Sequence, residues 1–418
     1  MVCALSSCAR YAPAPIDSGR RADRLLGARL SARSWTLRDL EAEAVRRSSE
    51  VAQARAQYET ARAAIRTAGE SPNPTLAASP QIVTPWAGLI PGTYGVDIDW
   101  QFETAGKRSR RIDLAHENAR AAAAHVVDAI WKARSTARTA FVDLAAAQQR
   151  VKLLTEVTTQ QDQLLHVFDE RIAAGEESRI IQAQPRLLQA QYHVQQADAV
   201  KSETLARAAL AQSLELSVAG LARANFVFPD LARAPRNVAI RRRDALTRRA
   251  DVLAALANYA AAEATLHLEI AKQYPDIHLG PGYTLDQGQN KWVLGLTATL
   301  PILNHNQGAI GEALSKRTEA AAAFDVVQAK ALGECDHAAA LLAAARAKLA
   351  TADALLAEQD RQVASEQRML TEGAGDRTSL LSAQTERSLT LVARLDALAD
   401  WQTALGAVEA ATQTPIAP

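Results

Sequence analysis

The side chains in this sequence that could bind a metal are eight histidines and three cysteines. A metal site on a helix needs two such residues three or four positions apart, so that both point from one face. No two histidines have that spacing, and Cys335-Asp336-His337 supplies at most half of a site. The histidines are His116, His125, His166, His193, His267, His278, His305 and His337. The spacing therefore predicts neither a metal site nor a bound cofactor.

Two short motifs suggest other kinds of chemistry. Gly106-Lys107-Arg108 resembles a phosphate-binding turn, but it lacks the earlier glycines and the Ser or Thr of a P-loop. Asp97 and Asp99 are neighbouring carboxylates, but no nucleophile motif accompanies them. The formal net charge of +1 gives no reason to expect nucleic-acid binding. The sequence thus predicts a protein that is not an enzyme.

The most informative feature of the chain is an internal duplication. The matching pairs of segments are 46–58 with 248–259, 94–102 with 292–300, and 175–184 with 375–384. All three pairs are separated by about 200 residues. A repeat of this length indicates a duplicated structural half rather than a small solenoid unit.

Each half reads as a helix, two strands and a long helical hairpin. In the first half we expect a helix over 36–68, capped by Thr36 and Asp39, and then strands over 76–86 and 94–102. A helix over 107–173 follows, and then a return helix to about 217 that is kinked at Pro185. The second predicts a helix ending before 274, a hairpin of 277–286 and 291–300, and helices over 308–372 and 377–411. About 65 helical residues span roughly 100 Å, which no globular core needs.

The domain organisation follows from this repeat. We expect a leader at 1–35, a first repeat at 36–225, a linker at 226–237, a second repeat at 238–412 and a tail at 413–418. Leu5-Ser6-Ser7-Cys8 has the form of a bacterial lipoprotein cleavage site, in which Cys8 would be lipidated. The stretch before it is shorter than a secretory signal, so we interpret it as a truncated signal followed by an extended leader.

The strands alternate between apolar and polar residues, and this pattern predicts two different faces. Four strands per chain cannot close a barrel, and open edges in lipid would leave backbone groups unpaired. Three copies would supply about twelve strands. The sequence therefore predicts a mainly α protein with membrane β-structure, in which long helical hairpins form a trimeric α-barrel and four strands per chain contribute to a shared 12-stranded β-barrel.

The alternation assigns residues to the two faces. The lipid-facing or interfacial set is Tyr94, Val96, Ile98, Trp100, Phe102, Trp292, Leu294 and Leu296. The set that would line water inside the barrel is Asp97, Asp99, Gln101, Thr297 and Thr299.

The duplicated layout resembles the TolC family of trimeric outer-membrane efflux channels. The segment from Trp100 to Arg111 resembles the strand-to-helix signature of the CzcC-like branch, and the segment from Leu300 to Gly308 resembles its second-half counterpart. The resemblance covers about residues 36–412. It implies a homotrimeric duct in the bacterial outer membrane, with helices in the periplasm, that docks a periplasmic adaptor protein and an inner-membrane pump of the resistance–nodulation–division type.

The resemblance also implies a gate at the helical tips, which would contact the adaptor. By matching position, the tip residues are Gly175, Ser178, Gly375, Arg377 and Thr378, and Arg377 would help to hold the gate shut. Well-known members carry carboxylates just past the tips, where this chain has Ile181, Gln184, Leu381 and Gln384. The sequence does not name the cargo, which could be metal ions or small organic molecules.

A second interpretation is a soluble coiled-coil scaffold without transport activity. It explains the long helices but leaves the repeated strand pairs without a role. Cell fractionation separates the two, because a duct should require detergent and a scaffold should not.

Overall fold

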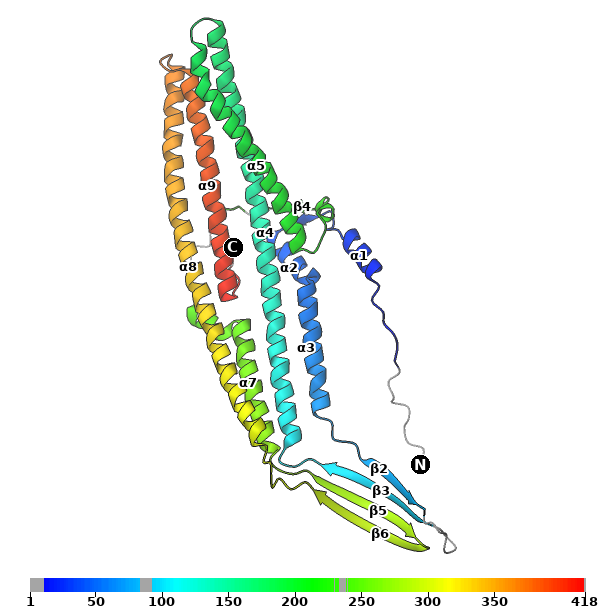
Figure 1. The fold of residues 1–418 in the computed structure, drawn as a ribbon. Helices are drawn as coiled ribbons and strands as arrows, with labels where there is room; N and C mark the ends of the chain where they lie inside the picture. The colour runs from blue at the N-terminus through cyan, green and yellow to red at the C-terminus, as the bar shows by residue number, and fades with distance from the viewer. Residues whose placement is uncertain (1–10, 83–91, 229, 233–237, 239, 417–418) are drawn as a thin grey trace.

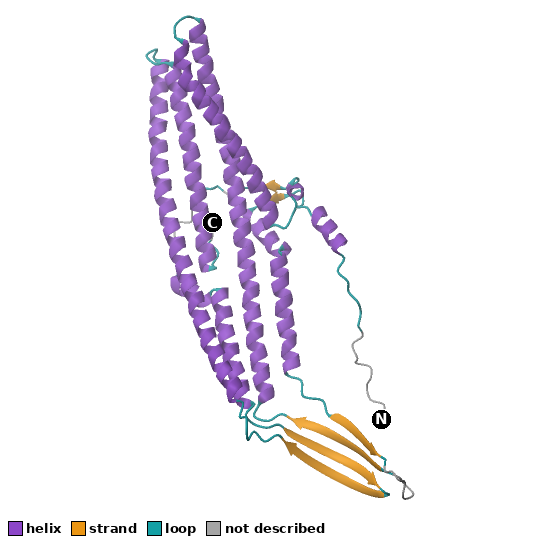
Figure 2. Ribbon diagram, in the orientation of Figure 1, coloured by secondary structure: helices purple, strands orange, loops and turns teal. Residues whose placement is uncertain are grey.

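The computed structural model describes residues 11–82, 92–228, 230–232, 238 and 240–416. These residues form a long slab of helices with a four-stranded sheet at one end and two helical tips at the other (Figure 1). All four strands of that sheet lie beyond the ends of the helices, so the two kinds of structure occupy separate layers (Figure 2). Cys8 lies outside the described residues.

The two repeats contain the same elements in the same order. The first contains α2 (Leu37–Arg47), α3 (Ser49–Ala68), β2 (Thr75–Gln81), β3 (Thr93–Phe102), α4 (Lys107–Ala173) and α5 (Ala183–Ser213). The second contains α6 (Arg242–Arg248), α7 (Ala250–Ala271), β5 (Ile277–Asp286), β6 (Gln289–Ala298), α8 (Gln307–Thr371) and α9 (Arg377–Thr412). The order of elements in each half is the one predicted from the sequence.

Several local features differ from the sequence-based expectation. The expected helix over 36–68 is broken at Ser48, whose backbone is not helical, with φ of −53° and ψ of 119°. Its Oγ accepts a hydrogen bond from the Val51 N–H at the start of α3. The expected cap is confirmed, since Thr36 and Asp39 form a capping box on α2. Pro185 does not kink a helix; it is the third residue of α5, which follows a 3-10 turn over Arg179–Gln182. A first-turn N–H has no intrahelical acceptor, so proline costs nothing there.

The leader is not extended throughout. It contains the exposed helix α1 (Ser18–Gly27), and its last residues join the core, where Leu30 and Trp35 are buried. Trp35 belongs to β1 (Ser34–Trp35), which pairs in parallel with β4 (Asn225–Phe226) beside α2 and α5. The buried part of the first repeat therefore begins before the predicted boundary at residue 36.

The sheet has the strand order β2-β3-β5-β6, and every neighbouring pair is antiparallel. The β5–β6 turn is tighter than predicted, because only Gln287 and Gly288 lie between the strands and both have positive φ, of 50° and 85°. Such a two-residue turn matches the natural twist of a hairpin. The sheet joins the two repeats, since β3 from the first pairs with β5 from the second. Its outer strands are β2 and β6.

The helices hold together through repeated polar pairs as well as apolar seams. Along α4 and α5, four side-chain hydrogen bonds recur at seven-residue steps: Gln148 with Glu203 at 3.2 Å, Thr155 with Gln196 at 3.0 Å, Asp162 with Gln189 at 2.6 Å and Asp169 with Gln182 at 2.6 Å. A seven-residue repeat keeps one seam facing the partner helix along its whole length. The antiparallel register of the hairpin is therefore fixed by side chains.

The core is thickest near the middle of the slab. Phe141 of α4 is fully buried and stacks on Phe228, with ring centroids 4.9 Å apart. Leu40, Leu144 and Leu210 are buried in the same cluster. Elsewhere the seams consist largely of alanine, which lets neighbouring helices lie close together. No helix in the described part of the chain has an apolar stretch of the length needed to cross a membrane.

A buried ion pair connects the sheet to the slab. Gly106 takes a left-handed conformation, with φ of 69°, and Lys107 starts α4. The Lys107 Nζ lies 2.7 Å from the Asp276 Oδ1 and donates to the Tyr274 carbonyl at 2.7 Å. Asp276 also accepts from the Thr104 N–H at 3.0 Å. The motif Gly106-Lys107-Arg108 is therefore part of a structural junction between the sheet and α4.

We expect Lys107→Met to destabilise this junction. It would leave the Asp276 carboxylate without its cation in a site where both partners are largely buried, and breaking such a pair costs about 3–5 kcal/mol. The measurement is the melting temperature of the purified protein in detergent. Lys316→Met is the matched control, because Lys316 pairs with Glu312 on the surface of one helix. Equal shifts for the two variants would contradict the structural role of Lys107.

Candidate functional site

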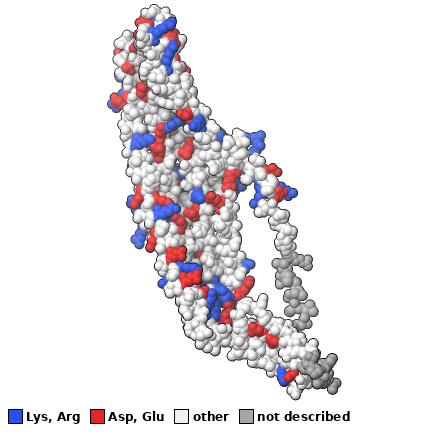
Figure 3. Space-filling model, viewed as in Figure 1, with Lys and Arg blue, Asp and Glu red and all other residues white. Residues whose placement is uncertain are grey.

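One face of the sheet is apolar and open to the surroundings. The predicted lipid-facing residues all lie on this face, and their side chains are at least 42% exposed, with Trp292 reaching 82%. The strand register places Val96 opposite Tyr283, and Tyr283 opposite Trp292. A water-exposed apolar face of this extent is unstable in a soluble protein and marks an interaction surface. Figure 3 shows that charged side chains are spread over the helices and are few over the sheet.

The opposite face of the sheet carries polar groups and glycines. Asp97, Asp99, Gln101 and Thr297 all lie on it, since they alternate with the apolar residues of their strands. The Asp99 Oδ2 lies 2.9 Å from the Nδ1 of His278, and Gln101 donates to Asp276 at 3.1 Å. Thr299 is the exception, because β6 ends at Ala298 and Thr299 belongs to the following loop. This face is suited to water.

The centre of the same polar face is rich in glycine. Gly280 and Gly295 are directly paired across β5 and β6, and Gly282 is opposite Asp97. Gly95 meets Ser79 so closely that a Cβ there would lie 2.6 Å from the Ser79 Oγ. A side chain at Gly95 would therefore require the Ser79 hydroxyl to move, and the glycines leave space on the polar face.

At the first helical tip, α4 ends in a common C-terminal arrangement. Gly175 has a φ of 74°, and the Glu176 N–H donates to the Arg171 carbonyl at 2.9 Å. This is the arrangement that glycine favours just after a helix, because it has no Cβ to clash in the left-handed region. Ser178 then caps the 3-10 turn through the Ile180 N–H. Gly175 and Ser178 therefore both lie at the first tip, and their predicted contact with an adaptor stays a prediction.

The second tip differs from the first in the position of its left-handed glycine. The left-handed residue is Gly373, with φ of 73°, so Gly373 and not Gly375 is the equivalent of Gly175. Gly375 is needed for a different reason, since a Cβ there would lie 2.7 Å from the Leu370 nitrogen. Asp376 caps α9 by accepting from both the N–H and the hydroxyl of Thr378, at 3.2 and 2.6 Å.

An ion pair that the sequence did not reveal joins the two tips. Arg171, in the last turn of α4, forms a double hydrogen-bonded pair with Asp376, with the Nη1 lying 2.9 Å from the Oδ2. The Arg171 guanidinium lowers the pKa of Asp376 to about 2, and the bonds from Thr378 act in the same direction. The two residues are 205 positions apart, and the predicted elements alone could not show that they meet.

Arg377 does not take part in that pair. Its side chain is exposed, and within the described residues no hydrogen bond or ion pair of its side chain is found. The prediction that Arg377 holds a gate shut therefore concerns contacts between copies and stays a prediction. Of the positions that carry carboxylates in well-known relatives, Leu381 is buried against Leu164 and Val167, whereas Ile181 is 40% exposed.

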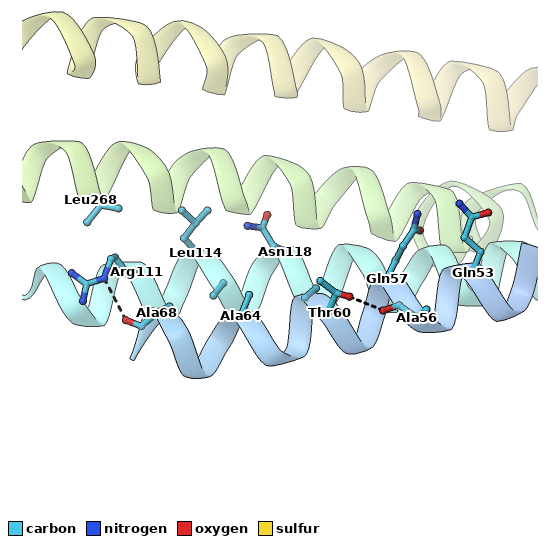
Figure 4. Close-up of a pocket in the computed structure, with 12 residues that line it drawn as sticks. Gln53, Ala56, Gln57, Thr60, Ala64, Ala68, Arg111, Leu114, Asn118 and Leu268 are labelled. Atoms are coloured by element: carbon cyan, nitrogen blue, oxygen red, sulfur yellow. Dashed lines mark hydrogen bonds between the residues drawn. The ribbon is translucent and has the colours of Figure 1, made fainter. Parts of the chain in front are cut away.

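The described surface also has a shallow groove of about 740 Å³ between α3 and α4 (Figure 4). Its lining combines small residues such as Ala56, Ala64 and Ala68 with Gln53, Gln57 and Asn118. Arg111 is its ionisable residue, and its guanidinium is paired with Glu103. No acid–base pair or nucleophile lines this groove, so it offers packing rather than chemistry. Nor do the described residues gather three metal-ligating side chains at one place.

Comparison with known proteins finds relatives of this chain. Residues 242–413 match the family model described as outer membrane efflux protein. This match covers the second repeat of the chain. It is 28% identical over 220 residues to the cobalt-zinc-cadmium resistance protein CzcC of Cupriavidus metallidurans. That match covers 52% of each protein, so it spans about half the length of this relative.

Solved structures show that the fold extends over almost the whole chain. The outer-membrane channel CusC has a TM-score of 0.73 at 17% identity and matches 91% of this chain and 92% of its own. The outer membrane protein VceC of Vibrio cholerae has a TM-score of 0.72 at 20% identity, covering 90% and 96% of the two chains. The predicted fold of long helical hairpins with four strands per chain is therefore confirmed, and the family match over residues 242–413 agrees with the predicted resemblance.

We expect Asp376→Asn to loosen the closed tip. The substitution removes the charge that pairs with Arg171, so the second hairpin is held less firmly to the first. Because the pKa of Asp376 is lowered, the pair should be intact above about pH 4 and lost only as the pH falls through about 2. The measurement is single-channel conductance in a planar bilayer, which should rise in the variant and stay constant in the parent between pH 5 and 8.

Asp360→Asn is the matched control for this prediction. Asp360 pairs with Arg387 at 2.5 Å, but both residues belong to the same hairpin. Removing that charge should therefore leave the conductance as it is in the parent. The same conductance in Asp376→Asn as in Asp360→Asn would count against a role for the pair between the tips.

Proposed function

We propose that this protein is the outer-membrane channel subunit of a tripartite efflux pump. In this role it is a passive duct, and the partner pump drives the cargo through it. The observation that carries the proposal is the sheet, whose apolar face is exposed and whose opposite face carries polar groups and glycines. At the opposite end of the slab are the helical tips, so one chain presents a membrane-facing end and a distant gate.

Several copies have to share one barrel. The outer strands β2 and β6 run in opposite directions, because three antiparallel pairings separate them. The β6 of one copy can therefore pair antiparallel with the β2 of the next without breaking the pattern. Sheet edges exposed to lipid cost several kcal/mol for each unpaired backbone group. A homotrimer with about twelve strands satisfies both edges and gives an even strand number, as outer-membrane barrels require.

The position of the duct follows from the same geometry. The sheet lies in the bacterial outer membrane, and the helices, about 100 Å long at 1.5 Å per residue, extend into the periplasm. The tips then meet a periplasmic adaptor protein that connects them to an inner-membrane pump of the resistance–nodulation–division type. Cobalt, zinc and cadmium appear in the name of the relative CzcC, and metal ions and small organic molecules are both suitable cargo for a duct with no binding chemistry of its own.

The proposal predicts the behaviour of the purified protein. It should be found in the outer-membrane fraction and should require detergent for extraction. On a denaturing gel, an unheated sample should run as a trimer, and boiling should convert it to a monomer. In a planar bilayer it should form channels that are nearly closed. A protein recovered from the soluble fraction as a monomer would favour the scaffold interpretation instead.

A pair of substitutions tests the two faces of the sheet. Leu294→Arg puts a charge on the apolar face, which costs about 2–4 kcal/mol near the middle of a bilayer. It should reduce the amount of trimer in the outer membrane several-fold. Thr297→Arg, on the polar face of the same strand, should assemble at the parent level. If the two variants assemble equally well, the assignment of faces is wrong.

A further inference from the structure

The strands of the sheet carry few charges, and all of them lie on its polar face. In the described strands the charged side chains are those of Asp97, Asp99, Asp286 and Lys291. Each stands next in its strand to a residue of the apolar face, as Asp97 does to Ile98, so alternation places it on the opposite side. Ionisable residues in a membrane-spanning segment are costly and by default mark a function.

These charges do not cancel. Asp286 is balanced, because its Oδ2 lies 2.6 Å from the Lys291 Nζ. Asp99 is hydrogen-bonded to His278, whereas the Asp97 side chain has no hydrogen bond or ion pair within the described residues. With a neutral histidine, three carboxylates and one ammonium group give this face a net charge of −2 in each chain.

Asp97 is the least screened of these groups. It is the fifth residue of the ten-residue strand β3, so it lies near the middle of the sheet. Directly opposite is Gly282, where a Cβ would lie only 3.4 Å from the Cβ of Asp97. Gly280 and Gly295, paired with each other, lie on the same face. With glycine beside it and no cation among the described residues in contact, the carboxylate directs its field into the space over the polar face.

We propose that Asp97 makes the duct selective for cations over anions. This inference rests on the proposed duct, since rotation about the tube axis places the Asp97 of every copy at one height and so forms a ring of carboxylates midway along the barrel. Rings of Asp or Glu side chains are a general means by which pores favour cations. Asp99 supplies a second layer about 7 Å away, two residues along the strand.

The ring of Asp97 carboxylates acts through its field and need not bind an ion. A negative potential in the lumen raises the local concentration of cations and lowers that of anions. It reaches over about one Debye length, which is ~10 Å at ~0.1 M salt and ~30 Å at ~0.01 M. Inorganic and organic cargo are therefore both favoured when they are positively charged, and the selectivity is greatest in dilute salt.

Reversal potentials test this selectivity. The full-length protein is placed in a planar bilayer with a tenfold gradient of dilute KCl across it, and the parent should pass K⁺ in several-fold preference to Cl⁻. Asp97→Asn removes one charge from each copy and should lower the permeability ratio of K⁺ to Cl⁻ several-fold. Gly282→Lys in the parent chain places an ammonium group beside Asp97 and should lower the ratio in the same way, so the test does not depend on one variant.

Gly282→Asp in the Asp97→Asn background is the matched rescue. Positions 97 and 282 are directly paired, so the new carboxylate lies on the same face at the same height. Gly282 has no positive φ, and a Cβ there meets its neighbours at ordinary contact distances of 3.4 Å or more. The double variant should therefore fold and recover the parent ratio. A purely structural role for Asp97 would not be restored by a charge on another strand.

The outcomes separate the charge-selecting role of Asp97 from the duct. If the parent passes K⁺ and Cl⁻ equally well, or if Asp97→Asn keeps the parent ratio, this role is wrong and the duct stands. The role is also wrong if the double variant runs as a heat-sensitive trimer but does not recover the ratio. A parent protein that is a monomer in detergent and forms no channel would overturn both proposals.

Discussion

The open edges of the sheet are the constraint on which the rest of this structure depends. A strand edge in lipid has no water to satisfy its N–H and C=O groups, so β2 and β6 cannot remain unpaired. The same chain provides the solution, because its two edge strands are antiparallel to each other and continue the alternation. The long helices are subject to a similar constraint. The helices of one chain form a slab with two open sides, and only copies placed side by side form a closed wall.

The duplication gives the two halves equivalent backbone positions at the ends of their long helices. Gly106 and Asn306 occupy equivalent left-handed positions before the two long helices, and Gly175 and Gly373 occupy equivalent positions after them. Asparagine can replace glycine there because it tolerates the left-handed region better than most residues. Ion pairs across the repeats, such as Lys107 with Asp276, then keep the two halves together.

Regular features of the sequence were predictable, and contacts between distant segments were not. The period-two alternation of Tyr94 to Phe102 gave the faces of β3, and the lack of Pro and Gly from Lys107 to Ala173 gave α4 to the residue. By contrast, Arg171 and Asp376 look like ordinary helix-end charges in the sequence. Their pairing depends on how α4 and α9 pack, which local pattern does not encode. Gly375 lies in the second tip, but only the backbone angles show that Gly373, and not Gly375, has the left-handed conformation of Gly175.

The proposed duct needs a closed state that is stable but can be opened by contact with the proposed partner protein. The pair between Arg171 and Asp376 is suited to this, because both side chains are about one-third exposed. Solvent screens such a pair, so it holds the tips by a modest free energy. The fully buried cluster around Phe141 lies far along α4 from the tips, and there separation would cost much more. Movement is therefore easiest at the tips and hardest in the middle of the slab, which is the distribution of stability expected for a channel gated at one end.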